Sequence, residues 1–248
     1  MTLSTIRNNP AKQKKVKTKK QKAIAATCAV AFWLLVWHVV SLCVGSELVL
    51  VSPVKVVQTL FTVIFDPDFL KTVWYSAARI LGGFFTALTL GTVLGWVASR
   101  FWVVETLLRP ITAVIKATPV ASFIILVLLW FSGKNLSVII SMLMVFPVIY
   151  MNVLEGIRSA DKKLLEMAQV FRLSVGKKLL YIYLPAVAPF FVSACSVSLG
   201  LCWKSGIAAE VIGTPDGSIG AVFYQAKIFL QTSELLAWTV VVVAVSVA

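Results

Sequence analysis

A polar stretch, EMAQVFRLSVGKKLLYIYLP (residues 166–185), interrupts an otherwise strongly apolar chain. Four charged side chains lie within it: Glu166, Arg172, Lys177 and Lys178. Asp161 can cap a helix ahead of this stretch, and Ser174 and Gly176 allow a turn before Leu184-Pro185, so the pattern predicts helix, turn, helix. A mixed-charge helical loop between two apolar runs favours a surface that a soluble partner binds.

The composition predicts an integral membrane protein. The chain has 248 residues, of which 59% are hydrophobic and 13% charged, and its mean hydropathy is +0.93. Soluble domains are about a quarter charged. We therefore expect an all-α, polytopic transmembrane helix bundle, which leaves no room for a separate soluble catalytic domain.

Apolar segments divide the chain into about six spans, each needing about 20 residues. They lie near residues 23–45, 80–98, 111–131, 136–154, 186–208 and 235–248. The last segment has 14 residues, or about 21 Å of helix, whereas a span needs about 30 Å. We expect the sixth span to be truncated at the end of this sequence; a short or re-entrant helix is the alternative.

Basic residues predict the orientation. Residues 1–22 hold eight of the 23 Lys and Arg, which indicates a cytoplasmic tail that attracts anionic lipid rather than nucleic acid. With this end inside, 17 Lys and Arg lie on the cytoplasmic side and 6 outside. The same topology places residues 155–184 in the cytoplasm, and residues 23–248 form the transmembrane domain.

Smaller motifs predict local structure. Ser52-Pro53 starts an amphipathic outer helix, and Ser218 can cap a second short one. Gly91-x-x-x-Gly95 permits close helix contact in lipid. Pro119 interrupts the third span. The four cysteines all lie in apolar runs without C-x-x-C spacing, which indicates neither a metal site nor a disulfide framework.

Residues 166–185 resemble the coupling loop of bacterial ABC-transporter permeases, whose pattern is Glu-Ala-Ala, three residues, Gly, nine residues, Ile-x-Leu-Pro. The matching positions are Glu166, Ala168, Ile182, Leu184 and Pro185. Met167 replaces the central Ala, and Arg172 stands at the Gly position, with Gly176 four residues later. These departures bear on the turn geometry and on the fit to the ATPase.

Further motifs, in the order of the family, resemble the nitrate/sulfonate/taurine class of these permeases. They are Ser52-Pro53-x-x-Val56, Ser76-x-x-Arg79-x-x-x-Gly83-Phe84, Arg109-Pro110 through Thr118-Pro119, Leu128-x-Trp130-Phe131, and Trp203-Lys204 followed by Ala209-Glu210-x-Ile212-Gly213. The resemblance implies a type I ABC importer permease-like fold and a permease subunit that forms the pathway for a small solute such as a sulfonate, taurine or nitrate.

The resemblance also implies the partners. A second permease subunit, expected to be an identical copy, two ATPase subunits and an extracytoplasmic binding protein complete the transporter in a bacterial cytoplasmic membrane. ATP and Mg²⁺ would be used by the ATPase, so this subunit would carry no cofactor, metal or catalytic residue. Consistently, no Gly-x-x-x-x-Gly-Lys-Ser/Thr loop occurs. ATPase coupling would fall to Glu166, Met167, Ala168, Arg172, Gly176, Ile182, Leu184 and Pro185.

Ionisable groups in or beside the spans are candidate pathway residues. Lys116, just before Thr118-Pro119, either faces the bundle interior and attracts an anion or extends to the membrane surface. Lys204 either pairs with Glu210 or meets an anionic substrate.

Two other classes of protein remain as alternatives. A secondary transporter driven by an ion gradient would usually carry paired acidic groups in its spans, and none interrupts the first four predicted spans. A membrane-embedded enzyme would need clustered His, Asp or Glu, whereas this chain has one His and ten acidic residues spread along it. The sequence does not select the substrate.

Overall fold

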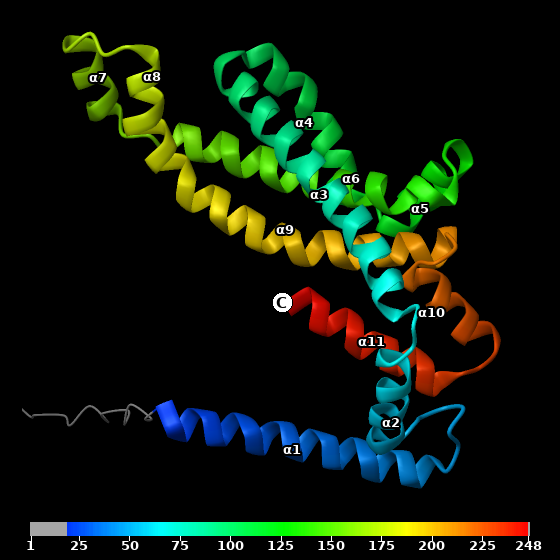
Figure 1. The fold of residues 1–248 in the computed structure, drawn as a ribbon. Coiled ribbons are helices and arrows are strands. Elements are labelled where there is room, and N and C mark those ends of the chain that lie inside the picture. The colour runs from blue at the N-terminus through cyan, green and yellow to red at the C-terminus, as the bar shows by residue number, and fades with distance from the viewer. Residues whose placement is uncertain (1–18, 248) are drawn as a thin grey trace, which may run out of the picture. The chain divides into compact units, whose positions relative to one another are not determined.

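The computed structural model describes residues 19–247, and every regular element in that range is helical (Figure 1). The elements are α1 (Lys19–Val44), α2 (Pro53–Ile64), α3 (Phe69–Arg100), α4 (Trp102–Ala117), α5 (Val120–Trp130), α6 (Gly133–Arg158), α7 (Lys162–Val170), α8 (Val175–Lys178), η1 (Leu179–Tyr183, a π-helix), α9 (Leu184–Gly213), α10 (Ile219–Ile228) and α11 (Thr232–Val247). This confirms the all-α prediction. Most of the predicted basic tail lies outside the described residues.

The chain divides into two compact units, residues 1–54 and 55–248. In the first unit, α1 is a long apolar helix whose segment Thr27–Val44 could cross a membrane. Ser41 donates a hydrogen bond to the Leu50 carbonyl oxygen across 3.0 Å, which folds the following turn back onto the helix end. The second unit contains the rest of the bundle.

Four described helical segments are long and apolar enough to cross a membrane: Thr27–Val44, Phe69–Arg100, Gly133–Arg158 and Val175–Gly213. The bent pair α4–α5 would make a fifth crossing or a re-entrant loop. α11 has 16 residues and is apolar. The prediction of a multi-span bundle is confirmed, although α3 begins 11 residues before the span expected at residues 80–98.

The interruption expected at Pro119 in the third span, residues 111–131, is a break between two helices. α4 and α5 meet at an angle of 109°. Thr118 is extended, with φ −85° and ψ 134°, because the ring of the following Pro119 disfavours a helical conformation at the preceding residue. Pro119 also lacks an amide hydrogen and cannot continue the helical hydrogen bonds.

Close packing of α3 and α9 against α6 forms the core of the second unit (Figure 1). A Cβ atom added at Gly91 or at Gly95 would lie 3.0 Å from Ile149 or Val153 of α6. The predicted small-residue face of α3 is therefore confirmed as a helix–helix contact. Glycine has no side chain to separate the backbones, which is how such faces pack in lipid.

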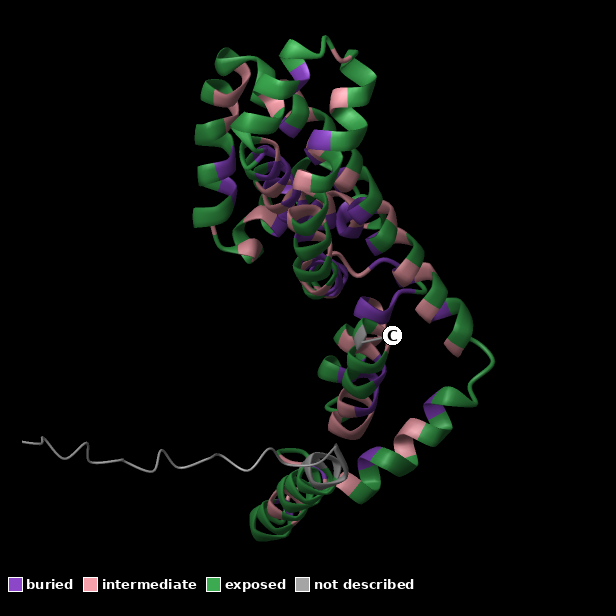
Figure 2. Ribbon diagram, turned by 90° about the vertical axis from the view of Figure 1, so that its left-hand side faces the viewer, coloured by how far each residue is buried: buried purple, intermediate pink, exposed green. Residues whose placement is uncertain are grey.

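α9 approaches the same core through Gly206, where an added Cβ would meet Ile80 of α3 and Ser141 of α6. Fully buried side chains form one apolar cluster here: Ile80, Ala87, Val145, Ile149, Ala194 and Ile219. Figure 2 colours the buried positions of the chain purple. α11 joins through the Trp203 indole nitrogen, which donates to the Val242 carbonyl oxygen across 3.0 Å. Many other apolar side chains are exposed, as expected of a surface facing lipid or another subunit.

Two adjacent glycines test this packing. An added Cβ at Gly83 would strike the backbone oxygen of Val138 and come within 2.8 Å of Ser141, whereas at Gly82 it would meet nothing within 4 Å. Gly83→Ala should therefore destabilise the protein by about 1–3 kcal/mol through overpacking. Gly82→Ala should be neutral or slightly stabilising, since alanine favours helix by about 1 kcal/mol.

Thermal unfolding of the purified variants in detergent measures both effects. Equal melting temperatures for the two variants would contradict the close α3–α6 contact.

Candidate functional site

The predicted coupling loop forms a helical hairpin outside the three-helix core. Its first helix, α7, begins at Asp161, whose carboxylate accepts a hydrogen bond from the Lys163 amide across 2.9 Å, as the sequence predicted. The helix ends where the Leu173 amide donates to the Ala168 carbonyl oxygen and the Arg172 amide to that of Gln169. These two bonds define a Schellman motif, in which the C′ residue adopts a left-handed conformation.

Arg172 is that C′ residue, with φ 48°. It occupies the position at which the permease pattern has Gly, and glycine is the residue that adopts this conformation without steric cost. The expected turn is present and includes Ser174, which directly precedes α8, but Gly176 lies within α8 and has no positive φ. The loop thus keeps the turn of the motif while carrying a residue that strains it by about 1 kcal/mol.

A small apolar cluster holds the hairpin together. Ala160, Ala168 and Ile182 are buried at its centre, with Leu165 and Leu173 beside them. Ala168 and Ile182 are two of the motif positions, so the motif places a small and a branched side chain where α7 meets the start of the next helix. Their role in this geometry is to fix the hairpin.

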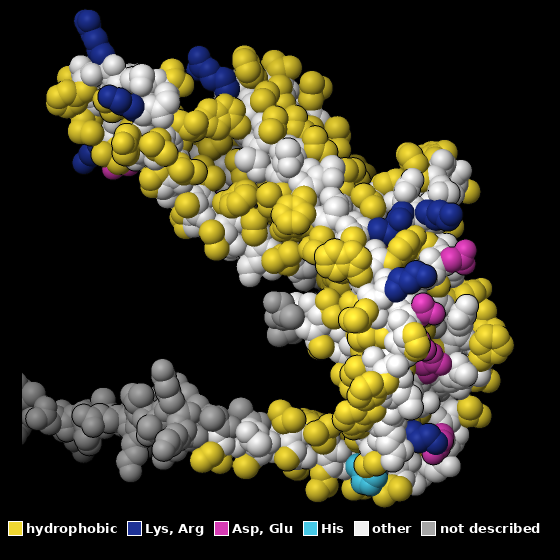
Figure 3. Space-filling view, in the orientation of Figure 1, with side chains coloured by type: hydrophobic (Ala, Val, Ile, Leu, Met, Phe, Trp, Pro, Cys, Tyr) yellow, Lys and Arg dark blue, Asp and Glu magenta, His cyan; other side chains and the backbone are white. Residues whose placement is uncertain are grey.

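Other motif positions lie on the surface. Glu166 and Met167 are exposed, and so are Leu184 and Pro185. Large apolar side chains around the turn are exposed as well: Val170 at 80%, Phe171 at 71% and Val175 at 78%. Figure 3 shows these hydrophobic side chains with neighbouring Lys and Arg at the tip of α7 and α8, at the upper left. The tip is therefore apolar, basic and open.

The second helix of the hairpin continues into a segment that is long and apolar enough to cross a membrane. α8, η1 and α9 form one helical segment, Val175–Gly213, of 39 residues. The π-helix at Leu179–Tyr183 lies directly before Pro185. Because a proline ring clashes with the carbonyl group four residues earlier, the wider π-turn lets the helix accommodate it. The motif's Leu184-Pro185 thus lies inside a continuous helix rather than between two helices.

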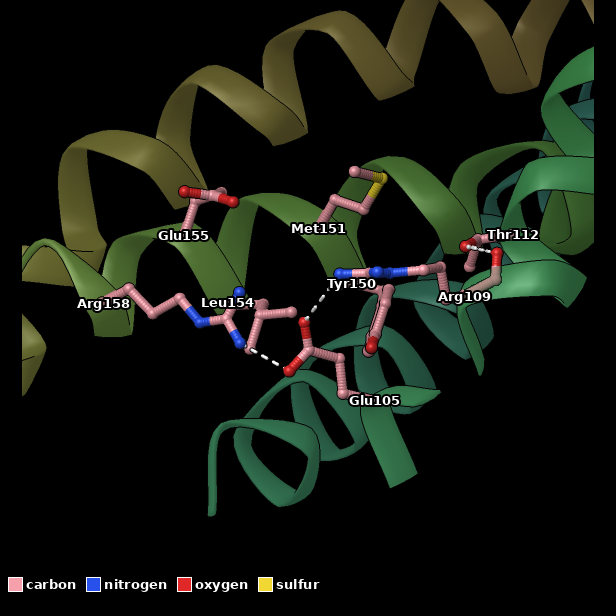
Figure 4. Close-up of a pocket in the computed structure, with 8 residues that line it drawn as sticks. All are labelled: Glu105, Arg109, Thr112, Tyr150, Met151, Leu154, Glu155 and Arg158. Carbon is pink, nitrogen blue, oxygen red and sulfur yellow. Dashed lines mark hydrogen bonds and ion pairs between the residues drawn. The ribbon is translucent and has the colours of Figure 1, made fainter. Parts of the chain in front are cut away.

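An ion-paired cluster joins α4 to α6 close to the hairpin (Figure 4). The Glu105 carboxylate pairs with Arg158, the last residue of α6, and its other oxygen lies 3.7 Å from Arg109. The cluster borders a cavity of about 120 Å³, which is also lined by the buried Tyr150. Sequence reasoning missed this cluster, because Glu105 and Arg158 lie 53 residues apart and carry no shared motif.

The first group of predicted pathway residues lies at the α4–α5 break. Thr118 and Pro119 form the break itself, and the Thr118 hydroxyl donates to the Val114 carbonyl oxygen across 2.8 Å. Lys116 is exposed, and its amino nitrogen lies 2.6 Å from the Met151 sulfur on α6. Met151 also lines the cavity beside the ion-paired cluster, so Lys116 lies at the edge of that cavity.

The other two predicted pathway residues, Lys204 and Glu210, lie in different environments. Lys204 is exposed, whereas Glu210 is fully buried. The Glu210 carboxylate accepts hydrogen bonds from the Ser76 hydroxyl across 2.6 Å and from the Gly220 amide across 3.4 Å. The Ile219 amide donates to Ser76 across 2.9 Å. The predicted Lys204–Glu210 pair is therefore wrong, and Glu210 instead ties α9 to α3 and α10.

Comparison with known proteins identifies the family to which the chain belongs. The family model of the binding-protein-dependent transport system inner membrane component matches residues 87–248. The chain belongs to this family. Its relatives include the aliphatic sulfonates transport permease protein SsuC of Bacillus subtilis (strain 168), 29% identical over 211 residues that cover 84% of this chain and 76% of that protein.

The taurine transport system permease protein TauC of Escherichia coli (strain K12) is 27% identical and covers 85% of this chain and 78% of its own length. The nitrate import permease protein NrtB of Synechocystis sp. is 25% identical, with 82% and 76% covered. The family is one of permease components of ABC importers, and such components work with an ATPase and a binding protein and are not themselves enzymes. The chain is thus a multi-pass membrane permease component.

The strained turn at Arg172 can be tested by substitution. Arg172→Gly should stabilise the hairpin by about 1 kcal/mol, because glycine removes the steric cost at φ 48°. Arg172→Ala should bring no such gain, since alanine meets the same strain. Hydrogen exchange of residues 162–183 measures the local opening free energy.

Slower exchange in the glycine variant alone is the expected result. Equal slowing in both variants would trace the effect to loss of the arginine side chain and contradict the turn assignment.

Proposed function

We propose that the hairpin of residues 161–185 is the surface on which the ATPase docks, and that this subunit forms the pathway of an ATP-driven importer together with a second, identical copy. ATP and Mg²⁺ belong to the ATPase in this account. The proposal rests on how the motif residues are buried. Ala168 and Ile182 are buried and fix the hairpin, whereas Met167 and the apolar tip are exposed.

The apolar tip supports docking to a protein. Phe171 and Val175 expose most of their side-chain surface beside the basic residues Lys177 and Lys178. Aromatic side chains in the centre of an interface contribute most of the binding energy in protein complexes. The positive-inside distribution supports a cytoplasmic position for the tip and the N-terminus.

The helical connections support transmission of movement. On one side, Ala160 of the hairpin cluster lies two residues after Arg158, the end of α6; on the other, α8 runs continuously into α9. Glu105 links the end of α6 to α4 and so to the bend at Thr118-Pro119. Displacement of the hairpin would therefore move α6 and α9. Through the Glu105 ion pair it would also move the α4–α5 pair. Packed helices of this kind can switch between two arrangements.

The relatives support a small solute that carries an anionic group as the substrate. SsuC, TauC and NrtB are named for sulfonates, taurine and nitrate. Lys116 and Lys204 are exposed on separate helices in the single subunit, and a cationic side chain beside a pathway raises the local concentration of anions. Glu210 has a positioning role in this account, since its hydrogen bonds are internal.

Two phenylalanines form a matched test of docking. Phe171 at the hairpin tip is 71% exposed, and Phe229 at the α10–α11 turn is 70% exposed. Phe171→Ser should lower co-purification of the ATPase about tenfold, which corresponds to loss of one hot-spot side chain. Phe229→Ser should leave ATPase binding unchanged.

Affinity purification of the membrane complex, with the permease amount normalised, gives the measurement. An ATPase yield that falls equally in both variants, or in neither, would remove the hairpin tip from the interface.

A further inference from the structure

Two cavities lie side by side where the ends of α3 and α6 meet the π-helix η1 at the base of the hairpin. Their volumes are about 120 Å³ and about 200 Å³. Trp96, Ile157 and Tyr183 line both of them. These shared walls allow one elongated ligand to occupy the two cavities together.

The smaller cavity is apolar. Aliphatic side chains form most of its wall: Val153, Ile157, Leu179, Leu184 and Val187. Thr92 also lines it, but the Thr92 hydroxyl donates to the Leu88 carbonyl oxygen across 2.7 Å and so has its partner within α3. Apolar cavities stay dry and bind apolar ligands. The smaller cavity therefore suits a hydrocarbon chain.

The larger cavity carries a positive charge. Arg100, the last residue of α3, lines it together with Ser99. Neither cavity has an acidic lining residue, and among residues 19–247 no carboxylate pairs with Arg100. An arginine side chain can bind a phosphate group through two parallel hydrogen bonds. The larger cavity therefore suits a phosphate.

The aromatic residues between the two cavities are those typical of a membrane surface. The rings of Trp96 and Tyr183 lie 6.3 Å apart, edge to face. Trp and Tyr are enriched where the hydrocarbon of a membrane meets water. The distribution of basic residues favours the cytoplasmic side for this end of α3, and basic pockets between helices on that side bind anionic lipid headgroups.

We propose that the two cavities form one site for an anionic phospholipid, with its phosphate at Arg100 and one acyl chain in the apolar cavity. A zwitterionic lipid fits less well, because no acidic side chain lines the site to meet its ammonium group. The bound lipid contacts α3 and η1 together and so supports the base of the hairpin. The inference does not depend on ATPase docking, since it concerns the permease alone.

Native mass spectrometry of the purified permease counts the bound lipid. The protein is incubated in detergent with equal amounts of phosphatidylglycerol and phosphatidylcholine that have the same acyl chains. One phosphatidylglycerol per permease chain should remain bound in preference to phosphatidylcholine. Arg100→Gln should weaken phosphatidylglycerol binding about tenfold, because hydrogen bonds to a charged group are lost.

Lys163→Gln is the matched control. Lys163 is an exposed basic residue of α7 that lines neither cavity, so the variant removes the same charge elsewhere on the hairpin side. It should bind phosphatidylglycerol as the natural protein does. Thr92→Phe tests the other cavity, since the larger side chain would fill it. This variant should lose phosphatidylglycerol although Arg100 is retained.

Size-exclusion chromatography confirms that each variant remains folded. Equal retention of the two lipids, an equal loss of phosphatidylglycerol in Arg100→Gln and Lys163→Gln, or unchanged binding in Thr92→Phe would overturn the proposal. The same count on the assembled transporter distinguishes lipid from protein as the occupant. Loss of the bound lipid on assembly would show that another subunit covers the two cavities and would also overturn the proposal.

Discussion

Close packing of α6 against α3 and α9 holds the second unit together. In lipid, burying apolar surface brings no gain over exposing it, so helices associate by close packing and by hydrogen bonds between them. Gly91 and Gly95 of α3 and Gly206 of α9 allow this approach, because an added Cβ at each would lie closer to a neighbouring helix than ordinary van der Waals contact. The broken helix, the outer helices and the hairpin all attach to this three-helix core.

The same three-helix core positions the hairpin. Gly156 lies near the end of α6, and an added Cβ there would come within 2.9 Å of Val187 near the start of α9. The two helices that carry the hairpin are thus in contact at its base, and Ala168 and Ile182 fill the space beyond them. A hairpin built in this way has little freedom to move alone. Its displacement by a partner would be passed to α6 and α9 together.

The sequence predicted the helical class, the small-residue face of α3 and the caps at Asp161 and Ser218, because each follows from local chemistry. Composition separates membrane from soluble chains, glycine spacing predicts close contact, and a capping side chain bonds within three residues. The resemblance of residues 166–185 to a coupling loop was recognisable for a related reason: the pattern is contained within 20 consecutive positions.

Features that depend on distant partners were not predictable. The Glu105–Arg158 pair and the Ser76–Glu210 bond join residues 53 and 134 positions apart. Lys204 and Glu210 are close in sequence but differ in burial, because Glu210 faces the core whereas Lys204 faces outward. The 109° bend at Pro119 was underestimated, since proline in an apolar run permits either a mild kink or a break and the surrounding helices decide between them.

In the assembled transporter, α8, η1 and α9 should move as one rigid segment when the hairpin moves. Spin labels at Val175→Cys and Val197→Cys, in a background with the four native cysteines replaced by serine, lie on exposed positions of this segment. They should be about 30 Å apart along the helix. Double electron–electron resonance on the assembled transporter should give the same narrow distance distribution with and without ATP. A shift of several ångströms between the two states would show that η1 bends as a hinge and would contradict the account.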